Sequence, residues 1–221
     1  MIIDRKEALR YMGFGKNDPD ERTAALMEEC IRETENTAQP RHVYRRFGLK
    51  VTEDDYIEAA GLRFHSRNLS KNLTGCGEII FFAATLGNGV DMLMNRYARL
   101  SIAKAAVLQA VAAAAIEAYC NQCQKSIEEK LAGEGLYLRP RFSPGYGDLS
   151  IAVQPDFLAA IDASKTVGIV LSEGGVMLPE KSVTAVMGIS GENSRCHIEG
   201  CEACPKKDCA YRRESRNEFK R

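Results

Sequence analysis

The feature that most constrains the fold is a long alanine-rich helical region that follows one strand-length apolar run. Gly77 to Thr85 is almost entirely apolar, and the Gly-Asn-Gly sequence at 87–89 then turns the chain. A continuous apolar run of this length indicates a buried strand. From residue 90 to about residue 131 small alanines dominate, so another element can approach the helix backbone closely. We therefore expect a buried strand followed by the central helical layer of a domain.

The remaining segments predict an α+β fold. Apolar spacing predicts helices over residues 4–12 and 18–35, with Asn17-Asp18-Pro19 as the cap of the second. Residues 43–63 mix β-branched and charged side chains, and Tyr56 to Gly61 also fits a short helical turn. The last third predicts a helix at 153–161, then strands at 166–171, 176–178 and 183–189. Late antiparallel strands after central helices favour α+β over a doubly wound sheet.

Composition excludes several classes of partner. Thirty Lys and Arg residues balance thirty Asp and Glu residues, so no broad basic surface is available for nucleic acid. The first residues reach charge at once, without the apolar run of a signal peptide. The longest apolar stretch, at 105–118, is broken by Gln109 and Glu117 and is too short to span a bilayer. We expect a cytoplasmic protein that binds neither nucleic acid nor membrane.

A loop at residues 139–146 carries the residues best suited to a small polar ligand. It contains the pattern Arg-x-x-x-Gly-Tyr, formed by Arg141, Gly145 and Tyr146 with Ser143 between them. A guanidinium can grip a carboxylate through two parallel hydrogen bonds, which an ammonium cannot do. Glycine lets backbone groups approach a ligand, and tyrosine offers both a ring face and a hydroxyl. By itself the same pattern also fits a structured loop whose arginine faces solvent.

Further residues give this loop a family resemblance. About twenty-five residues later come Leu171-Ser172-Glu173, then Met177-x-Pro179 and Ser182-Val183. In this order the motifs resemble the activation domain of cobalamin-dependent methionine synthase, over roughly residues 75–190. The resemblance implies helices packed on a mainly antiparallel sheet, and S-adenosylmethionine bound by the Arg-x-x-x-Gly-Tyr loop. We expect this domain over residues 1–193 and a cysteine-rich tail over 194–221.

The resemblance also implies further ligand contacts. Glu117, on the alanine-rich helix, and Glu134, just before the loop, resemble acidic positions that contact the ligand in the family. One departure concerns the strand beside the nucleoside, where the family carries bulky aromatic residues and this chain has Met187 and Gly188. Adenine packing is therefore expected to differ here.

A second nucleotide signal competes with this one. The strand ending at Thr85, with Gly87 and Gly89 before a helix, imitates the opening of a dinucleotide-binding or conventional methyltransferase fold. A third glycine at the right offset is missing, and no second strand ending in an acidic residue follows. We interpret the glycines as a plain turn from strand to helix.

The C-terminal segment predicts a metal site. Cys196, Cys201, Cys204 and Cys209 place four soft ligands within a short segment, with His197 as a possible substitute. Closed tetrahedral thiolate ligation suits zinc, whereas Cys-x4-Cys-x2-Cys also occurs in iron–sulfur ligation. Both metals stay open, as does a reduced tail without metal.

The function implied by the resemblance is reactivation of a corrinoid methyltransferase. S-adenosylmethionine would donate its methyl group to cob(II)alamin that an external electron donor reduces. The cobalamin would reside on a methionine synthase or another corrinoid protein acting in trans, since 221 residues leave no room for a cobalamin domain. No acid, base or nucleophile is required of this chain. The alternatives are an iron–sulfur electron carrier or corrinoid accessory using the cysteines, and a zinc-stapled interaction protein.

Overall fold

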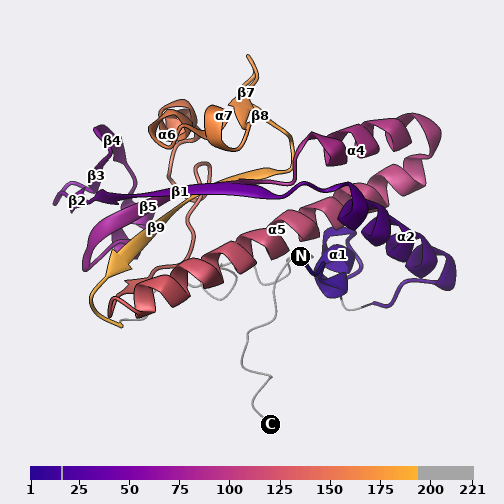
Figure 1. Ribbon diagram of the computed structural model, residues 1–221, viewed down its shortest axis with the longest axis horizontal. Coiled ribbons are helices and arrows are strands. Elements are labelled where there is room, and N and C mark those ends of the chain that lie inside the picture. Colours follow the sequence, from indigo (N-terminus) through magenta and orange to yellow (C-terminus); the bar gives the residue numbers. More distant parts are fainter. Residues whose placement is uncertain (16, 194–221) are drawn as a thin grey trace, which may run out of the picture.

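A four-stranded antiparallel sheet forms the centre of the molecule in the computed structural model, which describes residues 1–15 and 17–193. The strand order is β1-β5-β9-β6. The strands are β1 (Arg41–Gly48), β5 (Cys76–Thr85), β9 (Ser182–Ser190) and β6 (Tyr137–Leu138). Figure 1 shows the long helix α5 (Ile102–Ala132) crossing one face of this sheet, while α6 (Gln154–Ala160) and α7 (Ala163–Thr166) lie over the other. The expected α+β class is confirmed.

The strand β5 lies at the centre because its side chains are apolar on both faces. Ile80 and Phe82 join the core on the α5 side, whereas Ile79 and Phe81 join a second core on the opposite side. All four are at most 1% exposed. The buried strand predicted from the run of apolar residues is therefore confirmed, and it separates two hydrophobic cores.

The helical layer consists of α5 and three helices packed against it. These are α1 (Arg5–Tyr11), α2 (Glu21–Thr37) and α4 (Asn88–Leu100). The long helical region expected from residue 90 consists of two helices, because Ser101 has an extended backbone (φ −159°) and its side chain caps α5 at the Lys104 N–H. Likewise α2 begins after Asp20, whose carboxylate accepts from the Thr23 N–H at 2.7 Å, and not at the expected Asn17-Asp18-Pro19 cap.

Helix α5 is long and apolar enough to cross a membrane by length and composition, so the expectation that its apolar stretch is too short is wrong. Half of its most apolar 18-residue window is buried inside the protein. The burial lies against the sheet and against α1, α2 and α4. Its hydrophobicity is therefore explained by its place in the core.

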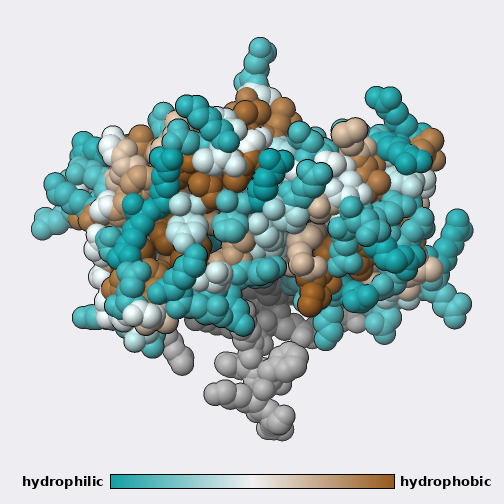
Figure 2. Space-filling view, in the orientation of Figure 1, coloured by the Kyte–Doolittle hydropathy of each residue, from teal (hydrophilic) through white to brown (hydrophobic). Residues whose placement is uncertain are grey.

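The opposite face of the sheet is covered by small elements. They are β2 (Lys50–Val51), β3 (Tyr56–Ala59), β4 (Leu62–His65), α3 (Arg67–Asn72), the 3-10 helix η1 (Ile151–Val153), α6, α7, β7 (Val170–Leu171) and β8 (Met177–Leu178). The helix expected at 153–161 is confirmed as α6. Of the strand expected at 166–171, only Val170 and Leu171 form β7, since Thr166 ends α7 and residues 167–169 belong to no helix or strand. Figure 2 shows a mainly hydrophilic surface with apolar side chains gathered around β7 and β8, where Val170, Val176 and Leu178 are exposed.

The helical turn considered for residues 56–61 is wrong, because these residues form a β-hairpin. Ala60 and Gly61 have positive φ values of 54° and 75°, which fits the two-residue turn between β3 and β4. Ile57 and Phe64 of this hairpin point into the second core. The alternation of buried and exposed residues here spans only four residues per strand, which is too short to separate from a helical turn by pattern.

Candidate functional site

The 139–146 loop begins with an extra residue beside β9. The Arg139 N–H donates to the Gly188 carbonyl at 2.8 Å, and Phe142 and Val186 exchange both backbone hydrogen bonds. Between these two pairings the loop advances by three residues while β9 advances by two, which is the geometry of a β-bulge. Pro140, which has no N–H to donate, occupies the irregular position.

Arg141 projects from this bulge onto the polar face of α5. Its Nη1 donates to Gln124 Oε1 at 2.8 Å, and its Nη2 donates to Asn121 Oδ1 at 2.8 Å and to Glu117 Oε2 at 3.2 Å. The three acceptors are spaced i, i+4 and i+7, so they share one helix face. The Arg141 side chain is 16% exposed. The structure therefore brings together two of the predicted site residues, Arg141 and Glu117, and adds Asn121 and Gln124.

The rest of the loop turns round the sheet edge. Gly145 has a φ of +85°, and its N–H donates to the Leu149 carbonyl at 2.8 Å. The Ser143 carbonyl accepts from the Tyr146 N–H at 3.0 Å. The Tyr146 ring is exposed and meets the Phe142 ring edge-on, with 5.2 Å between the centroids. Phe142 belongs to the core opposite α5, so Tyr146 lies beyond the sheet edge from Arg141.

A carboxylate that the sequence reading missed ties this loop to α3. Asp148 accepts hydrogen bonds from the Ser66 hydroxyl and from the Arg67 and Asn68 N–H groups. Burial by itself raises the pKa of Asp148, but these hydrogen bonds outweigh it and lower that pKa below its ordinary value. The carboxylate therefore stays ionised and fixes the far end of the loop against the first turn of α3.

Glu134 takes a different place from Glu117. Its carboxylate pairs with Arg46 Nη1 at 2.8 Å, and the same guanidinium also binds Glu78. Arg46 belongs to β1, which is one edge strand of the sheet, whereas β6, the strand that leads into the loop, is the other. The ion pair with Arg46 thus ties Glu134 to β1, and its predicted ligand contact stays a prediction.

The two departures on β9 have structural roles. Met187 is fully buried under α5. At Gly188 a Cβ atom would come within 2.6 Å of Cys76 Sγ and 2.8 Å of Leu73 Cδ2. Arg139, only 6% exposed, packs over the same glycine with its Cγ 3.2 Å from that Cβ position. The strand is therefore crowded where the family carries aromatic residues.

The dinucleotide-like glycines have a packing explanation. A Cβ atom at Gly89 would lie 2.8 Å from the Thr37 carbonyl oxygen, and one at Gly87 would lie 3.2 Å from that of Gln39. The strand β5 is antiparallel to both of its neighbours, whereas the competing folds need a parallel β-α-β unit. The plain turn is confirmed.

The cysteines of the described residues are free thiols, and three of the four are buried. Burial raises the pKa of Cys120 to about 12, so its thiol stays protonated beside Cys123 in the core. Residues 1–15 and 17–193 contain no group of three metal-binding side chains. The predicted metal ligands Cys196, Cys201, Cys204 and Cys209, with His197, lie outside the described residues.

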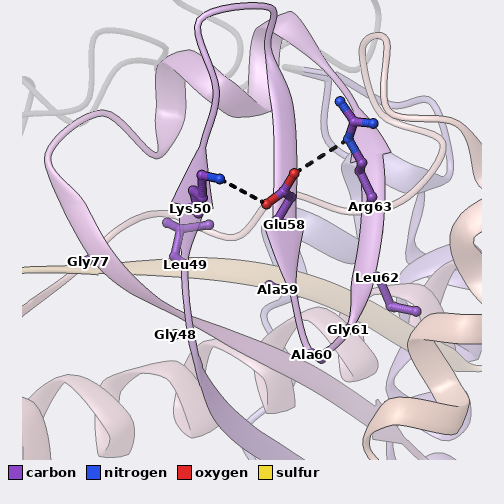
Figure 3. Close-up of a pocket in the computed structure, with 10 residues that line it drawn as sticks. All are labelled: Gly48, Leu49, Lys50, Glu58, Ala59, Ala60, Gly61, Leu62, Arg63 and Gly77. Atoms are coloured by element: carbon purple, nitrogen blue, oxygen red, sulfur yellow. Dashed lines mark ion pairs between the residues drawn. The ribbon is translucent and has the colours of Figure 1, made fainter.

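A shallow hollow of about 600 Å³ lies at the β2–β3–β4 corner (Figure 3). Glu58 stands in it between Lys50 and Arg63, with 3.5 Å between the charged atoms of each pair. The hollow is lined by Gly48, Leu49, Lys50, Glu58, Ala59, Ala60, Gly61, Leu62, Arg63 and Gly77. The two cations share one carboxylate, and none of the predicted site residues lines this hollow.

Comparison with known proteins decides the fold. No family model and no curated protein sequence matches the chain. The structure is similar to a crystal structure of the MetH reactivation domain bound to AdoHcy, with a TM-score of 0.62 and 19% sequence identity. The match covers 86% of this chain and 75% of that one. The chain has the reactivation-domain fold. At this identity the similarity establishes fold, and the expected activation-domain architecture is confirmed.

Proposed function

We propose that this chain binds S-adenosylmethionine at the Arg141 loop and supports reductive methylation of cob(II)alamin on a separate corrinoid protein. The observation that carries the proposal is the position of the Arg141 guanidinium, which lies on the polar face of α5 beside Glu117. The fold adds support, because the similar reactivation-domain structure is bound to AdoHcy. A cation and a carboxylate side by side complement the carboxylate and ammonium of the ligand's amino-acid portion.

The chain's contribution is binding and orientation. Arg141 and Glu117 would hold the amino-acid end, while Gly145 leaves space for backbone approach and Tyr146 offers an exposed ring at the loop's outer edge. The bound ligand supplies the methyl group, and the cobalt of the partner accepts it. Proximity alone can supply a large part of such a rate enhancement, so the proposal needs no acid or base from this chain.

Calorimetric titration with S-adenosylmethionine tests the binding step. Arg141→Ala should weaken binding about ten- to hundredfold, the range for losing a charge-assisted bidentate contact. Arg45→Ala is the matched control, because Arg45 pairs with Asp162 and lies on the far edge strand β1. Unmutated protein that binds no S-adenosylmethionine would refute the proposal.

A spectroscopic assay tests the transfer in trans. A corrinoid protein carrying cob(II)alamin, mixed with this chain, S-adenosylmethionine and a low-potential reductant, should convert to methylcobalamin. The Arg141→Ala variant should slow that conversion at limiting S-adenosylmethionine. If the spectrum of every candidate corrinoid protein stays unchanged, the proposed role in methyl transfer is refuted, even where the chain binds S-adenosylmethionine.

A further inference from the structure

The guanidinium of Arg141 is already occupied where a carboxylate would bind. Nη2 carries two N–H groups, and both are used, one by Asn121 and one by Glu117. A guanidinium grips a carboxylate through either of two planar edges, and both of these edges include Nη2. A bidentate ligand carboxylate therefore cannot bind until one of these two internal acceptors leaves.

We propose that the Glu117–Arg141 ion pair is exchanged when ligand binds, and that only a zwitterionic amino-acid group can drive the exchange. This inference rests on the proposed function and specifies the ligand chemistry of the same site. The ligand's carboxylate takes the N–H that Glu117 releases, and the ligand's ammonium takes the Glu117 carboxylate. One internal ion pair is replaced by two intermolecular ones.

Glu117 is the acceptor that leaves because its bond is the longest of the three. It lies 3.2 Å from Nη2, whereas Asn121 and Gln124 each lie 2.8 Å from the guanidinium. Glu117 also has the greater side-chain exposure of the pair, 29% against 16% for Arg141, so its carboxylate can turn toward an arriving cation. An ammonium replaces the guanidinium as its partner, and no buried charge is left unpaired.

Asn121 and Gln124 are positioning residues in this exchange. They hold the guanidinium while Glu117 departs, and neutral amides leave its positive charge available to the ligand. Gln124 is itself oriented, because its Nε2 donates to Glu128 Oε1 at 2.7 Å and its oxygen therefore faces Arg141. The side chain of Arg141 is thus fixed before ligand arrives, which lowers the entropy cost of binding.

Four thioether nucleosides test the exchange by calorimetry on the full chain. They are S-adenosylhomocysteine, its analogue without the ammonium, its analogue without the carboxylate, and 5′-methylthioadenosine, which lacks both. S-adenosylhomocysteine should bind about ten- to hundredfold more tightly than 5′-methylthioadenosine. Each half-analogue should bind only as well as 5′-methylthioadenosine, because each leaves one member of the opened pair without a partner. The two groups act only together.

Variants locate the effect in the pair. In the Glu117→Gln variant, the analogue without the ammonium should bind as tightly as S-adenosylhomocysteine binds to that same variant. The reason is that no glutamate carboxylate has to be released from Arg141. Gln124→Ala, which leaves both acceptors on Nη2 in place, should weaken S-adenosylhomocysteine several-fold and leave 5′-methylthioadenosine unchanged, a selectivity that general destabilisation would not produce. Arg45→Gln, at an exposed ion pair on the far edge strand, should change neither.

Additive contributions of the two charged groups in the unmutated protein would overturn the exchange. So would a carboxylate-only analogue that binds it as tightly as S-adenosylhomocysteine. If all four compounds bind equally, the nucleoside site of the proposed function survives and the exchange is wrong. If none binds, the proposed function fails with it.

Discussion

Two cations, Lys104 of α5 itself and Arg141 packed against α5, are held by the protein in different ways. Lys104, near the start of the helix, has an 8% exposed side chain and binds Glu29 at 2.7 Å and Glu33 at 2.8 Å. The Tyr97 ring also covers it, with 4.0 Å from Nζ to the ring centroid. Arg141, against the middle of the helix, has one carboxylate, at 3.2 Å, and two neutral amides.

The difference separates a structural cation from an exchangeable one. Two carboxylates overcompensate the charge of Lys104, and they join α2 to α5. One carboxylate balances Arg141, and the amides beside it direct the guanidinium without neutralising it. A ligand anion can therefore gain from Arg141 and has nothing to gain from Lys104.

The largest expected effect is on stability, at Lys104. Lys104→Met removes the cation and leaves the Glu33 carboxylate with a hydrogen bond from the Tyr97 hydroxyl at 3.2 Å and one buried oxygen that already lacks a partner in the described chain. We expect the free energy of unfolding in urea to fall by about 2–3 kcal/mol, less than for a fully buried pair because Glu29 is half exposed. S-adenosylmethionine affinity should not change. Lys50→Met, at a side chain that is 73% exposed, is the control and should cost under about 0.5 kcal/mol.

Arg141→Ala should give the reverse result. Ligand affinity falls about ten- to hundredfold, while the free energy of unfolding changes by less than about 1 kcal/mol, because the freed side chains can be hydrated. Chemical denaturation and calorimetry on the same preparations measure both quantities. A variant that loses more stability than Lys104→Met would place Arg141 among the structural cations.

The pH dependence sharpens the contrast. The hydrogen bond from Lys104 lowers the pKa of Glu29, so its stabilisation is present above the unfolded glutamate pKa of about 4.3 and is lost as pH falls through the folded value. The hydrogen bonds to Glu29 and Glu33 outweigh burial and raise the pKa of Lys104, so stabilisation persists up to at least about pH 10. The stability difference between unmutated protein and Lys104→Met should therefore shrink below about pH 4. A difference that stays constant down to pH 2 would contradict this.

Asp148→Asn should have a smaller effect on both properties. The variant weakens three hydrogen bonds that hold the loop to α3, and losing such a cap costs about 1 kcal/mol. Ligand affinity should fall less than in Arg141→Ala, because the guanidinium keeps its contacts with α5. An affinity loss as large as that of Arg141→Ala would show that the outer loop, and not the α5 face, governs binding.

The cysteine segment is expected to affect metal content and to leave ligand affinity nearly unchanged. Protein purified without oxygen should contain stoichiometric zinc or iron, and Cys201→Ser combined with Cys204→Ser should remove it. Elemental analysis and the visible spectrum distinguish the two metals. S-adenosylmethionine affinity should stay within about twofold, and a larger loss would join the cysteine segment to the ligand site.

Local patterns in the sequence were enough to predict β5, the first two helices and the α+β class. They did not reveal the break at Ser101, where a serine cap divides the helical region. They failed at residues 56–61, where each strand is too short to show alternation. In the site, family resemblance supplied Arg141 and Glu117. Asn121 and Gln124 were missed, although their spacing from Glu117 on one helix face was visible. The pairing of Glu134 with Arg46 depends on residues 88 positions apart, which no local pattern reveals.

The strand order β1-β5-β9-β6 has a consequence for synthesis of the chain. The apolar strand β5 is complete at Thr85, but its partner β9 begins only at Ser182. At ribosomal rates of about 5–20 residues per second, β5 waits roughly 5–20 s with one edge unpaired. During that interval it is paired at most with β1, and an apolar edge of this kind promotes association between nascent chains. Helix α5 is complete at Ala132, before β9 begins at Ser182, so the helices of the α5 layer can cover one face of β5 before β9 is made.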